Sequence, residues 1–153
     1  MLVYLSGPID AAPDRGLSWR EGVIEKLRVR GFHTYSPAHA FFLSPAGDMM
    51  KIAQQVDAIN RLAIGLCDVV LAYLPGGYRT VGTPREIEYA RTVGKPVVAV
   101  IDPPDQHIAL WDVHRVASFG EAIGWIEELS RGAHAQGDGH SPGDNESPPQ
   151  ARG

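Results

Sequence analysis

The sequence predicts a single α/β domain: a flavodoxin- or Rossmann-like parallel sheet of about five strands with helices on both faces. Short apolar runs of strand length alternate along the chain with amphipathic helical patterns. Two of the runs are apolar almost throughout, as expected of strands that are buried on both faces. Such alternation forms right-handed βαβ units, which build a parallel sheet. A length of 153 residues with 44% hydrophobic and 21% charged residues fits one globular domain.

Each expected strand is a short segment rich in apolar or β-branched residues. The five are 2–7, 32–37, 68–75, 95–102 and a short one near 115–117. The third and fourth are the almost continuously apolar runs. We therefore expect helices to cover both faces of these two strands.

Four helices are expected between and after these strands, each marked by an apolar stripe at helical spacing. The first is marked by Trp19, Val23, Ile24 and Leu27 and ends at Gly31, the second by Ile52, Val56, Ile59 and Ala63, the third spans 83–93, and the last is marked by Ala122, Trp125, Ile126 and Leu129. Residues 132–153 contain no large apolar side chain and are rich in Gly, Pro, Ser and Asp. Such a segment cannot offset the entropy of ordering itself, so we expect a folded domain at 1–131 and a disordered tail at 132–153.

Composition excludes several classes of function. A net charge of −4 argues against a nucleic-acid polymer as partner, because that partner requires a basic face. The single cysteine, Cys67, excludes an internal disulfide and a cysteine-based zinc site, and its apolar surroundings indicate a buried small side chain. The six histidines show no metal-binding spacing, and we expect no metal and no organic cofactor. With no apolar run near the ~20 residues of a membrane span and no basic leader, the expected location is the cytoplasm.

Three loops are expected at the edge of the sheet where α/β proteins bind ligands, beyond the carboxyl ends of the strands. They are "SGPIDAAPDR" after the first strand, "SPAHAFFLSP" after the second and "PGGYRTVGT" after the third. His39 of the second loop could line a site there. Arg15 and Arg20 follow the first strand within reach of an anion, although lone arginines are mostly surface residues.

The segment "GTPREIEYA" (82–90) can be interpreted in two ways. Thr83 and Glu86 form a capping box, in which the glutamate would accept the N–H of the residue that caps the helix. Alternatively, the glycine-rich loop and the start of the helix hold an oxyanion, with Thr80, Thr83, Gly82 and Arg79 as donors, and Glu86 faces the ligand.

A second capping box in the same chain, Ser118 to Glu121, has no glycine-rich loop before it. We expect Glu121 to cap its helix. Glu86 instead shares a helical face with Ala90 at the edge of an apolar stripe, so we expect its carboxylate to point toward a ligand. Asn60 similarly borders the buried face of its helix, where local hydrogen bonds usually satisfy such a residue, and Asp57 lies three residues before it.

Taken together, these stretches resemble the nucleoside 2-deoxyribosyltransferase superfamily, which cleaves the N-glycosidic bond of nucleosides or their 5′-monophosphates. The matching pieces are "YLSGPI" (4–9), "AINRLAIGLCDVVLA" (58–72) and "GTPREIEYARTVGKPVVAVI" (82–101). The resemblance implies that Glu86 is the catalytic nucleophile. It places Asn60 where relatives usually have an aspartate that contacts the sugar or base, which leaves Asp57 as a substitute proton donor. It also implies that the first motif lines the pocket, with the residues Tyr4, Ser6, Gly7, Pro8 and Ile9.

One position separates branches of that superfamily. Six residues before the nucleophile, the transferases usually have an aspartate, whereas the hydrolases of nucleoside 5′-monophosphates have a serine that holds the phosphate. This chain has Thr80 there. With Gly82, Thr83 and the arginines Arg15 and Arg79, it favours a nucleoside 5′-monophosphate N-glycosidase that needs no cofactor.

Base exchange by a deoxyribosyltransferase and a non-catalytic nucleotide sensor stay open as alternatives. "PGGYRTVGTPRE" also resembles the PGGxGTxxE motif of cytokinin-type phosphoribohydrolases, but its spacing is three residues longer and "YLSGPI" does not belong to that family. Relatives are commonly homodimers or larger, and 103–112 is a candidate for reaching into a neighbour's pocket.

Overall fold

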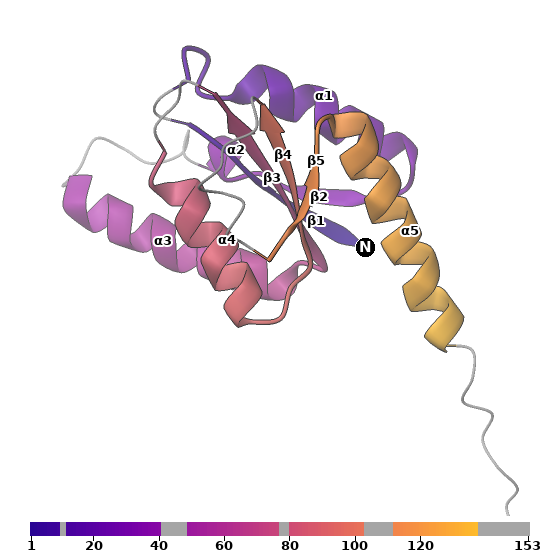
Figure 1. The fold of residues 1–153 in the computed structure, drawn as a ribbon. Helices are drawn as coiled ribbons and strands as arrows, with labels where there is room; N and C mark the ends of the chain where they lie inside the picture. The colour runs from indigo at the N-terminus through magenta and orange to yellow at the C-terminus, as the bar shows by residue number, and fades with distance from the viewer. Residues whose placement is uncertain (10–11, 41–48, 77–79, 103–111, 138–153) are drawn as a thin grey trace, which may run out of the picture.

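The structure is a computed structural model, and it describes residues 1–9, 12–40, 49–76, 80–102 and 112–137 of the chain. Its centre is one sheet of five strands in the order β2-β1-β3-β4-β5, and every neighbouring pair is parallel. The strands are β1 (Leu2–Ser6), β2 (His33–Tyr35), β3 (Val69–Pro75), β4 (Val97–Asp102) and β5 (His114–Val116). This is the flavodoxin-like order, and it confirms the α/β fold expected from the sequence (Figure 1).

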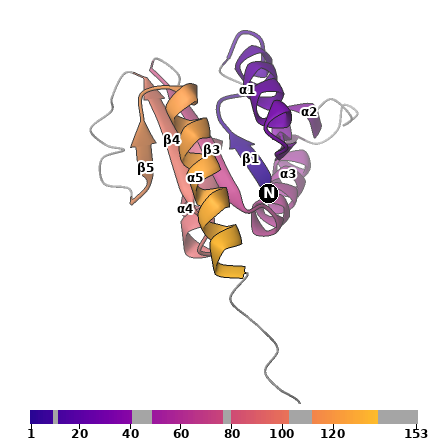
Figure 2. The ribbon, with the colours of Figure 1, turned by 90° about the vertical axis from the view of Figure 1, so that its right-hand side faces the viewer.

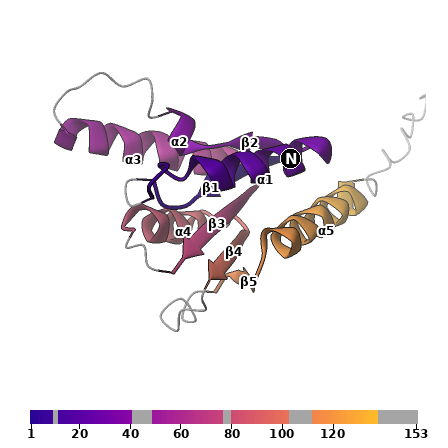
Figure 3. The same cartoon turned by 90° about the horizontal axis from the view of Figure 1, so that it is seen from above.

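Helices cover both faces of the sheet. They are α1 (Leu17–Val29), the single turn α2 (Pro37–Ala40), α3 (Met49–Leu66), α4 (Gly82–Thr92) and α5 (Phe119–Gly137). α3 and α4 pack on one face, and α1 and α5 pack on the other (Figures 2 and 3). Within the described ranges, no helix combines the length and the apolar character needed to cross a membrane.

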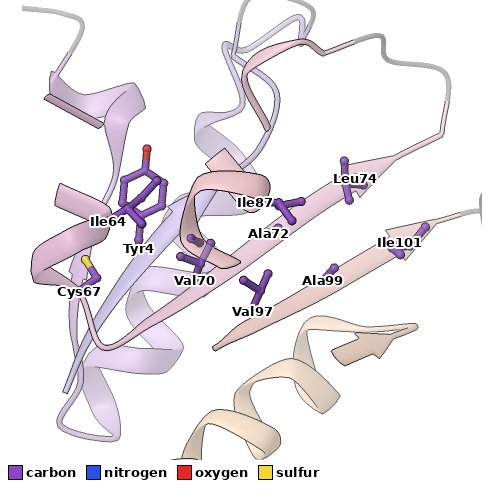
Figure 4. Packing of buried hydrophobic residues seen from close by; sticks show 11 residues of the cluster. Tyr4, Ile64, Cys67, Val70, Ala72, Leu74, Ile87, Val97, Ala99 and Ile101 are labelled. Atoms are coloured by element: carbon purple, nitrogen blue, oxygen red, sulfur yellow. The ribbon is translucent and has the colours of Figure 1, made fainter. Parts of the chain in front are cut away.

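Two apolar clusters, one on each face of the sheet, hold these layers together. Alternate residues of β3 enter opposite clusters: Val70 and Ala72 face α3 and α4, while Val69 and Leu71 face α1 and α5. This explains why the strand is apolar at nearly every position. Figure 4 shows the first cluster, with the Tyr4 ring at its border and the Tyr4 hydroxyl pointing away from Cys67. Cys67 is fully buried, as expected.

The buried face of α3 differs from the expected one by about one residue. Ile59, which we expected in the apolar stripe, is 51% exposed, whereas Asn60 and Ile64 are buried. Successive residues of a helix are about 100° apart, so a helix that turns Asn60 inward must turn Ile59 outward. The expectation for Ile59 was therefore wrong, because the helix buries the polar residue Asn60 in place of Ile59.

The last helix extends beyond the expected domain boundary at residue 131. α5 continues through Gly132 to Gly137. A glycine inside a helix costs only about 1 kcal/mol relative to alanine, and Ala133 and Ala135, on either side of His134, are strong helix formers. Residues 138–153, the rest of the expected disordered tail, lie outside the described part of the chain, as does nearly all of 103–112.

Candidate active site

The carboxylate of Glu86 accepts hydrogen bonds from three side chains on two other elements. Tyr4 Oη donates to Oε1 at 2.9 Å and Asn60 Nδ2 donates to the same oxygen at 3.0 Å, while Ser6 Oγ donates to Oε2. Glu86 lies near the start of α4, Tyr4 and Ser6 lie two residues apart on β1, and Asn60 is on α3. The structure therefore brings together four residues that the sequence analysis named as candidates.

The position of this cluster follows from the strand order. β1 has β2 on one side and β3 on the other, so the chain leaves the carboxyl ends of β1 and β3 in opposite directions. In open α/β sheets a ligand binds at such a switch point. Glu86 therefore lies at the edge of the sheet where a ligand is expected.

Glu86 does not cap its helix. Both of its oxygens are bound to side chains of β1 and α3 rather than to the N–H of Thr83, so the capping interpretation is wrong for this residue. Glu121 does cap its helix: its Oε2 accepts the N–H of Ala117 at 3.1 Å, and its own N–H donates to Ser118 Oγ at 3.2 Å. The same sequence pattern thus serves two different purposes in one chain.

The surroundings of Glu86 alter its titration. Burial raises the pKa of the Glu86 carboxyl above its usual value, while its three hydrogen bonds and the charge of Arg20 act in the opposite direction. Burial and the neighbouring Glu86 raise the pKa of Tyr4 far above the usual range, so its hydroxyl stays a donor. A desolvated carboxylate held by fixed donors is a recurring arrangement for a nucleophile or general base.

The first turn of α4 lies beside this cluster. The helix begins at Gly82, with Val81 as the capping residue, so the expectation that Thr83 caps it is wrong. Thr80 partly caps the helix instead, because the Thr83 N–H donates to Thr80 Oγ1 over a long distance of 3.4 Å. The hydroxyls of Thr80 and Thr83 are 3.3 Å apart. Gly82 is exposed and Thr83 is buried. Arg79 lies outside the described residues.

The turn after β1 is built around close packing. A side chain at Gly7 would place its Cβ 2.5 Å from the Trp19 ring, so only glycine fits beneath that indole. Pro8 is buried and Ile9 is half-buried. Gly16, which closes the loop at φ +67°, provides the left-handed backbone that glycine adopts without strain.

Arg20 is a functional candidate that sequence reasoning undervalued. The expectation that it is a surface residue is wrong: its side chain is fully buried. Its guanidinium donates to the carbonyls of Gly7 at 2.9 Å, Pro8 at 3.1 Å and Gly16 at 2.8 Å. One signal was available, because Arg20 precedes Val23 by three residues and Leu27 by seven and so shares their buried stripe.

Other candidates lie further from the Glu86 carboxylate or are directed elsewhere. The Asp57 carboxylate pairs with Arg61 at 2.9 Å and with Arg85 at 3.5 Å. Arg15 is exposed in the loop between β1 and α1, with φ 56°, and His39 is exposed on α2. Substrate binding by Asp57 and Arg15 stays a prediction. Within the described part of the chain, no group of three or more potential ligands gathers to hold a metal ion.

Residues 1–99 match the family model described as Domain of unknown function (DUF4406). The chain belongs to the DUF4406 family. Among curated protein sequences, none matches this DUF4406 protein significantly.

Solved structures share its fold. The 2-deoxyribosyltransferase of Bacillus psychrosaccharolyticus has a TM-score of 0.65 at 17% identity, over 80% of this chain and 90% of that one. The CMP N-glycosidase BcmB of Clostridium botulinum has a TM-score of 0.54 at 22% identity, over 84% of this chain and 99% of that one. A conserved protein of Enterococcus faecalis V583 has a TM-score of 0.61 at 19% identity, over 84% and 98%. The fold that the resemblance to the nucleoside 2-deoxyribosyltransferase superfamily implies is confirmed, and at these identities the likeness is one of fold.

Proposed function

We propose that this DUF4406 protein is a hydrolase that cleaves the N-glycosidic bond of a nucleoside or deoxynucleoside 5′-monophosphate. Its products would be the free base and ribose or deoxyribose 5-phosphate. The observation that carries the proposal is the part-buried Glu86 carboxylate at the switch point of the sheet, with both oxygens held by side-chain donors. A shared fold with a deoxyribosyltransferase and a CMP N-glycosidase supports the same reaction class.

In the proposed first step, one oxygen of Glu86 forms a bond to C1′ as the bond from C1′ to the base nitrogen breaks. The base leaves with the electron pair of that bond, and the transition state of this step is oxocarbenium-like. Water then attacks C1′, loses a proton to solvent and releases Glu86 as a carboxylate. The hydrogen bonds from Tyr4 and Ser6 would orient the Glu86 carboxylate toward C1′ and restrict its rotation.

The proposed acid for the leaving base has less support. Asn60, at the position where relatives usually carry an aspartate, offers an amide that already donates to Glu86. Asp57, the substitute, is bound to two arginines. We therefore propose that the departing base nitrogen is protonated by water that enters the site.

The proposed phosphate site is the start of α4. Backbone N–H groups at a helix N-terminus favour an anion, and the helix dipole adds to this attraction. Thr80 Oγ1 and the Thr83 N–H, 3.4 Å apart, form a long contact that a phosphate oxygen would replace. Gly82 leaves room for the phosphate, and Arg79 and Arg15 would neutralise it. Binding there is remote from C1′ and would position the sugar against Glu86.

A nucleotide panel tests this proposal. The protein is incubated with ribo- and deoxyribonucleoside 5′-monophosphates, and the free base is separated and measured by chromatography. Glu86→Ala is expected to lose about 10³-fold or more in rate. Glu88→Ala is the matched control, because Glu88 is exposed on the same helix and pairs only with Arg91 among the described residues. Base release that persists in Glu86→Ala would rule out Glu86 as the nucleophile.

Two alternatives give different results in the same assay. A deoxyribosyltransferase, whose fold this chain shares with a TM-score of 0.65, would exchange bases between unphosphorylated deoxynucleosides without net hydrolysis. A nucleotide sensor would bind a nucleotide tightly and release no base over long incubation.

We further propose a homodimer or higher homo-oligomer. α3 presents three exposed apolar side chains on one stripe: Ile59 at 51% exposure, Leu62 at 69% and Leu66 at 78%. Burying such a stripe against a second copy would remove it from water. Sedimentation analysis of the wild type should then give a mass above that of the 16.6 kDa chain, and Leu62→Glu should reduce it. A monomeric wild type would end this proposal.

A further inference from the structure

Arg20 carries a buried positive charge that the proposed reaction does not yet use. The side chain is fully buried, yet within the described ranges no carboxylate lies at ion-pair distance from it. Its Nε–H also lacks a hydrogen-bond acceptor in that part of the chain. Because burying a charge without a counter-charge is costly, such a residue requires an explanation.

Its contacts connect it to the candidate active site. The guanidinium is bound to the carbonyls of Gly7, Pro8 and Gly16, and it stacks over the Trp19 ring at 4.4 Å from the ring centroid. Gly7 directly follows Ser6, whose hydroxyl donates to Glu86. Arg20 therefore binds the carbonyl of the residue that directly follows Ser6, a hydrogen-bond donor of the proposed nucleophile.

We propose that Arg20 is a positioning residue for Glu86: its charge compensates the Glu86 carboxylate through the protein interior, and its hydrogen bonds fix the Gly7–Pro8 turn. This inference rests on the proposed function, because it assumes that Glu86 must be ionised to act. The inference means that Arg20 of α1, which packs on the other face of the sheet, contributes to the reaction of Glu86 on α4.

Electrostatics support a charge that acts at a distance here. Burial lowers the pKa of Arg20 to about 10, which leaves it a cation at neutral pH. The charge of Glu86 opposes that lowering most, followed by Tyr4 and Asp14. Reciprocally, Arg20 lowers the pKa of Glu86 against the effect of burial. Between charges separated by protein rather than water, attraction is weakly screened.

The other groups near Glu86 cannot take this role. Tyr4 and Tyr35, on β1 and β2, have raised pKa values because of burial and are neutral hydroxyls. Asn60 of α3 is an uncharged amide. The cations of the α3–α4 surface, Arg61 and Arg85, already pair with Asp57 at 46% and 57% side-chain exposure. Solvent screens charges at such exposure.

The test is a direct titration of Glu86. Its side-chain carboxyl carbon is followed by ¹³C NMR against pH, and the signal is assigned by its loss in Glu86→Gln. In Arg20→Gln the titration midpoint is expected to move upward; in Arg20→Lys, which keeps the charge, it is expected to return toward the wild-type value. The control is Arg28→Gln, which removes the same charge from an exposed site on the same helix. A midpoint that is unchanged in Arg20→Gln overturns the proposal.

Activity provides a second measurement. Arg20→Gln should lose more kcat/KM at the acid end of the pH profile than at the alkaline end, since a one-unit change in pKa alters the ionised fraction on the acid limb by about tenfold. A profile that is lowered equally at every pH, in Arg20→Lys as in Arg20→Gln, indicates a purely structural role and overturns the proposal. The NMR titration needs no turnover, so a protein without hydrolase activity can still show the shift. Conversely, an active hydrolase without the shift refutes only the role of Arg20.

Arg20→Gln could fail to fold, and a double variant then decides. If Arg20→Gln is unfolded by circular dichroism but Arg20→Gln combined with Glu86→Gln folds, the Glu86 carboxylate was the group that needed the cation, which supports the proposal. If both are unfolded while Glu86→Gln alone folds, Arg20 is required whatever residue 86 carries. That result overturns the charge compensation.

Discussion

The hydroxyl of Tyr4 offers a sharp test of how the Glu86 carboxylate is tuned. Tyr4→Phe removes one oxygen from a fully buried ring and leaves its apolar packing and its stacking on Tyr35 in place. The deleted group donates to Glu86 Oε1 at 2.9 Å, and the same oxygen keeps its hydrogen bond from Asn60. The perturbation is therefore confined to one donor of the carboxylate.

Its magnitude follows from the charge of the acceptor. A hydrogen bond to a charged group contributes about 1.5–3 kcal/mol, and one between neutral groups about 0.5–1.5 kcal/mol. Tyr4 therefore favours ionised over protonated Glu86 by roughly 1–1.5 kcal/mol, which corresponds to about five- to twelvefold in the ionised fraction at acid pH. Because the pKa of Tyr4 is raised, its hydroxyl stays protonated at alkaline pH. Ionisation of Tyr4 therefore does not contribute to the pH profile of the wild type.

The assay is kcat/KM for base release across roughly pH 5 to 9, for the wild type, Tyr4→Phe and Tyr35→Phe. Tyr4→Phe should lose activity mainly on the acid limb and approach the wild type on the alkaline plateau. Tyr35→Phe is the control for the loss of a nearby phenol. A Tyr4→Phe deficit that is constant with pH, or that grows toward alkaline pH, would refute the assigned role of the hydroxyl.

Three further predictions concern the same region. The folded-state pKa of Glu86 is raised above its unfolded value, so its contribution to stability is fully present below the unfolded pKa and lost as pH rises through the folded pKa. Glu86→Gln should therefore gain in urea stability relative to the wild type as the pH rises above 4.5; a pH-independent difference would contradict this. Asn60→Asp places a second carboxylate about 3.0 Å from Glu86 Oε1, and this like charge should raise the pKa of Glu86 and move the acid limb of the activity profile to higher pH; an unshifted pH profile counts against it. Gly7→Ala must displace Trp19 and should cost about 1–3 kcal/mol of unfolding free energy, whereas Gly22→Ala, in open space on α1, should stabilise by about 0.5–1 kcal/mol; equal effects in urea denaturation would contradict the packing explanation.

Much of the fold could be read from the sequence because it depends on periodicity. All five strands lie within the expected ranges or overlap them, since runs such as 68–75 are apolar at too many positions for a surface strand. The helix face was harder. The error at Ile59 arose because the pattern treats Asn60 as a polar border residue, whereas the helix buries it to reach Glu86.

The candidate site was readable in its members but not in its geometry. Tyr4 and Ser6 lie two residues apart on one strand and so share a face, and Glu86 shares a helical face with Ala90. That these faces meet depends on β1 lying beside β3, which the sequence of elements alone does not specify. The burial of Arg20 was not predicted, although its place in the apolar stripe of α1 indicated it. Its acceptors are main-chain carbonyls of a turn closed by the left-handed Gly16, and side-chain patterns do not reveal such acceptors.

The long sequence separation between Glu86 and its hydrogen-bond donors on β1 has a consequence for the order in which the chain folds. Its donors on β1 precede it by 80 and 82 residues, so no hairpin or single βαβ unit contains the complete cluster. Long-range contacts of this kind form late, after the loops between them have been closed. A partly folded chain would thus lack the hydrogen bonds that orient the Glu86 carboxylate. During refolding, catalytic competence should appear with the slowest docking event, when α4 seats against β1, and later than most of the secondary structure.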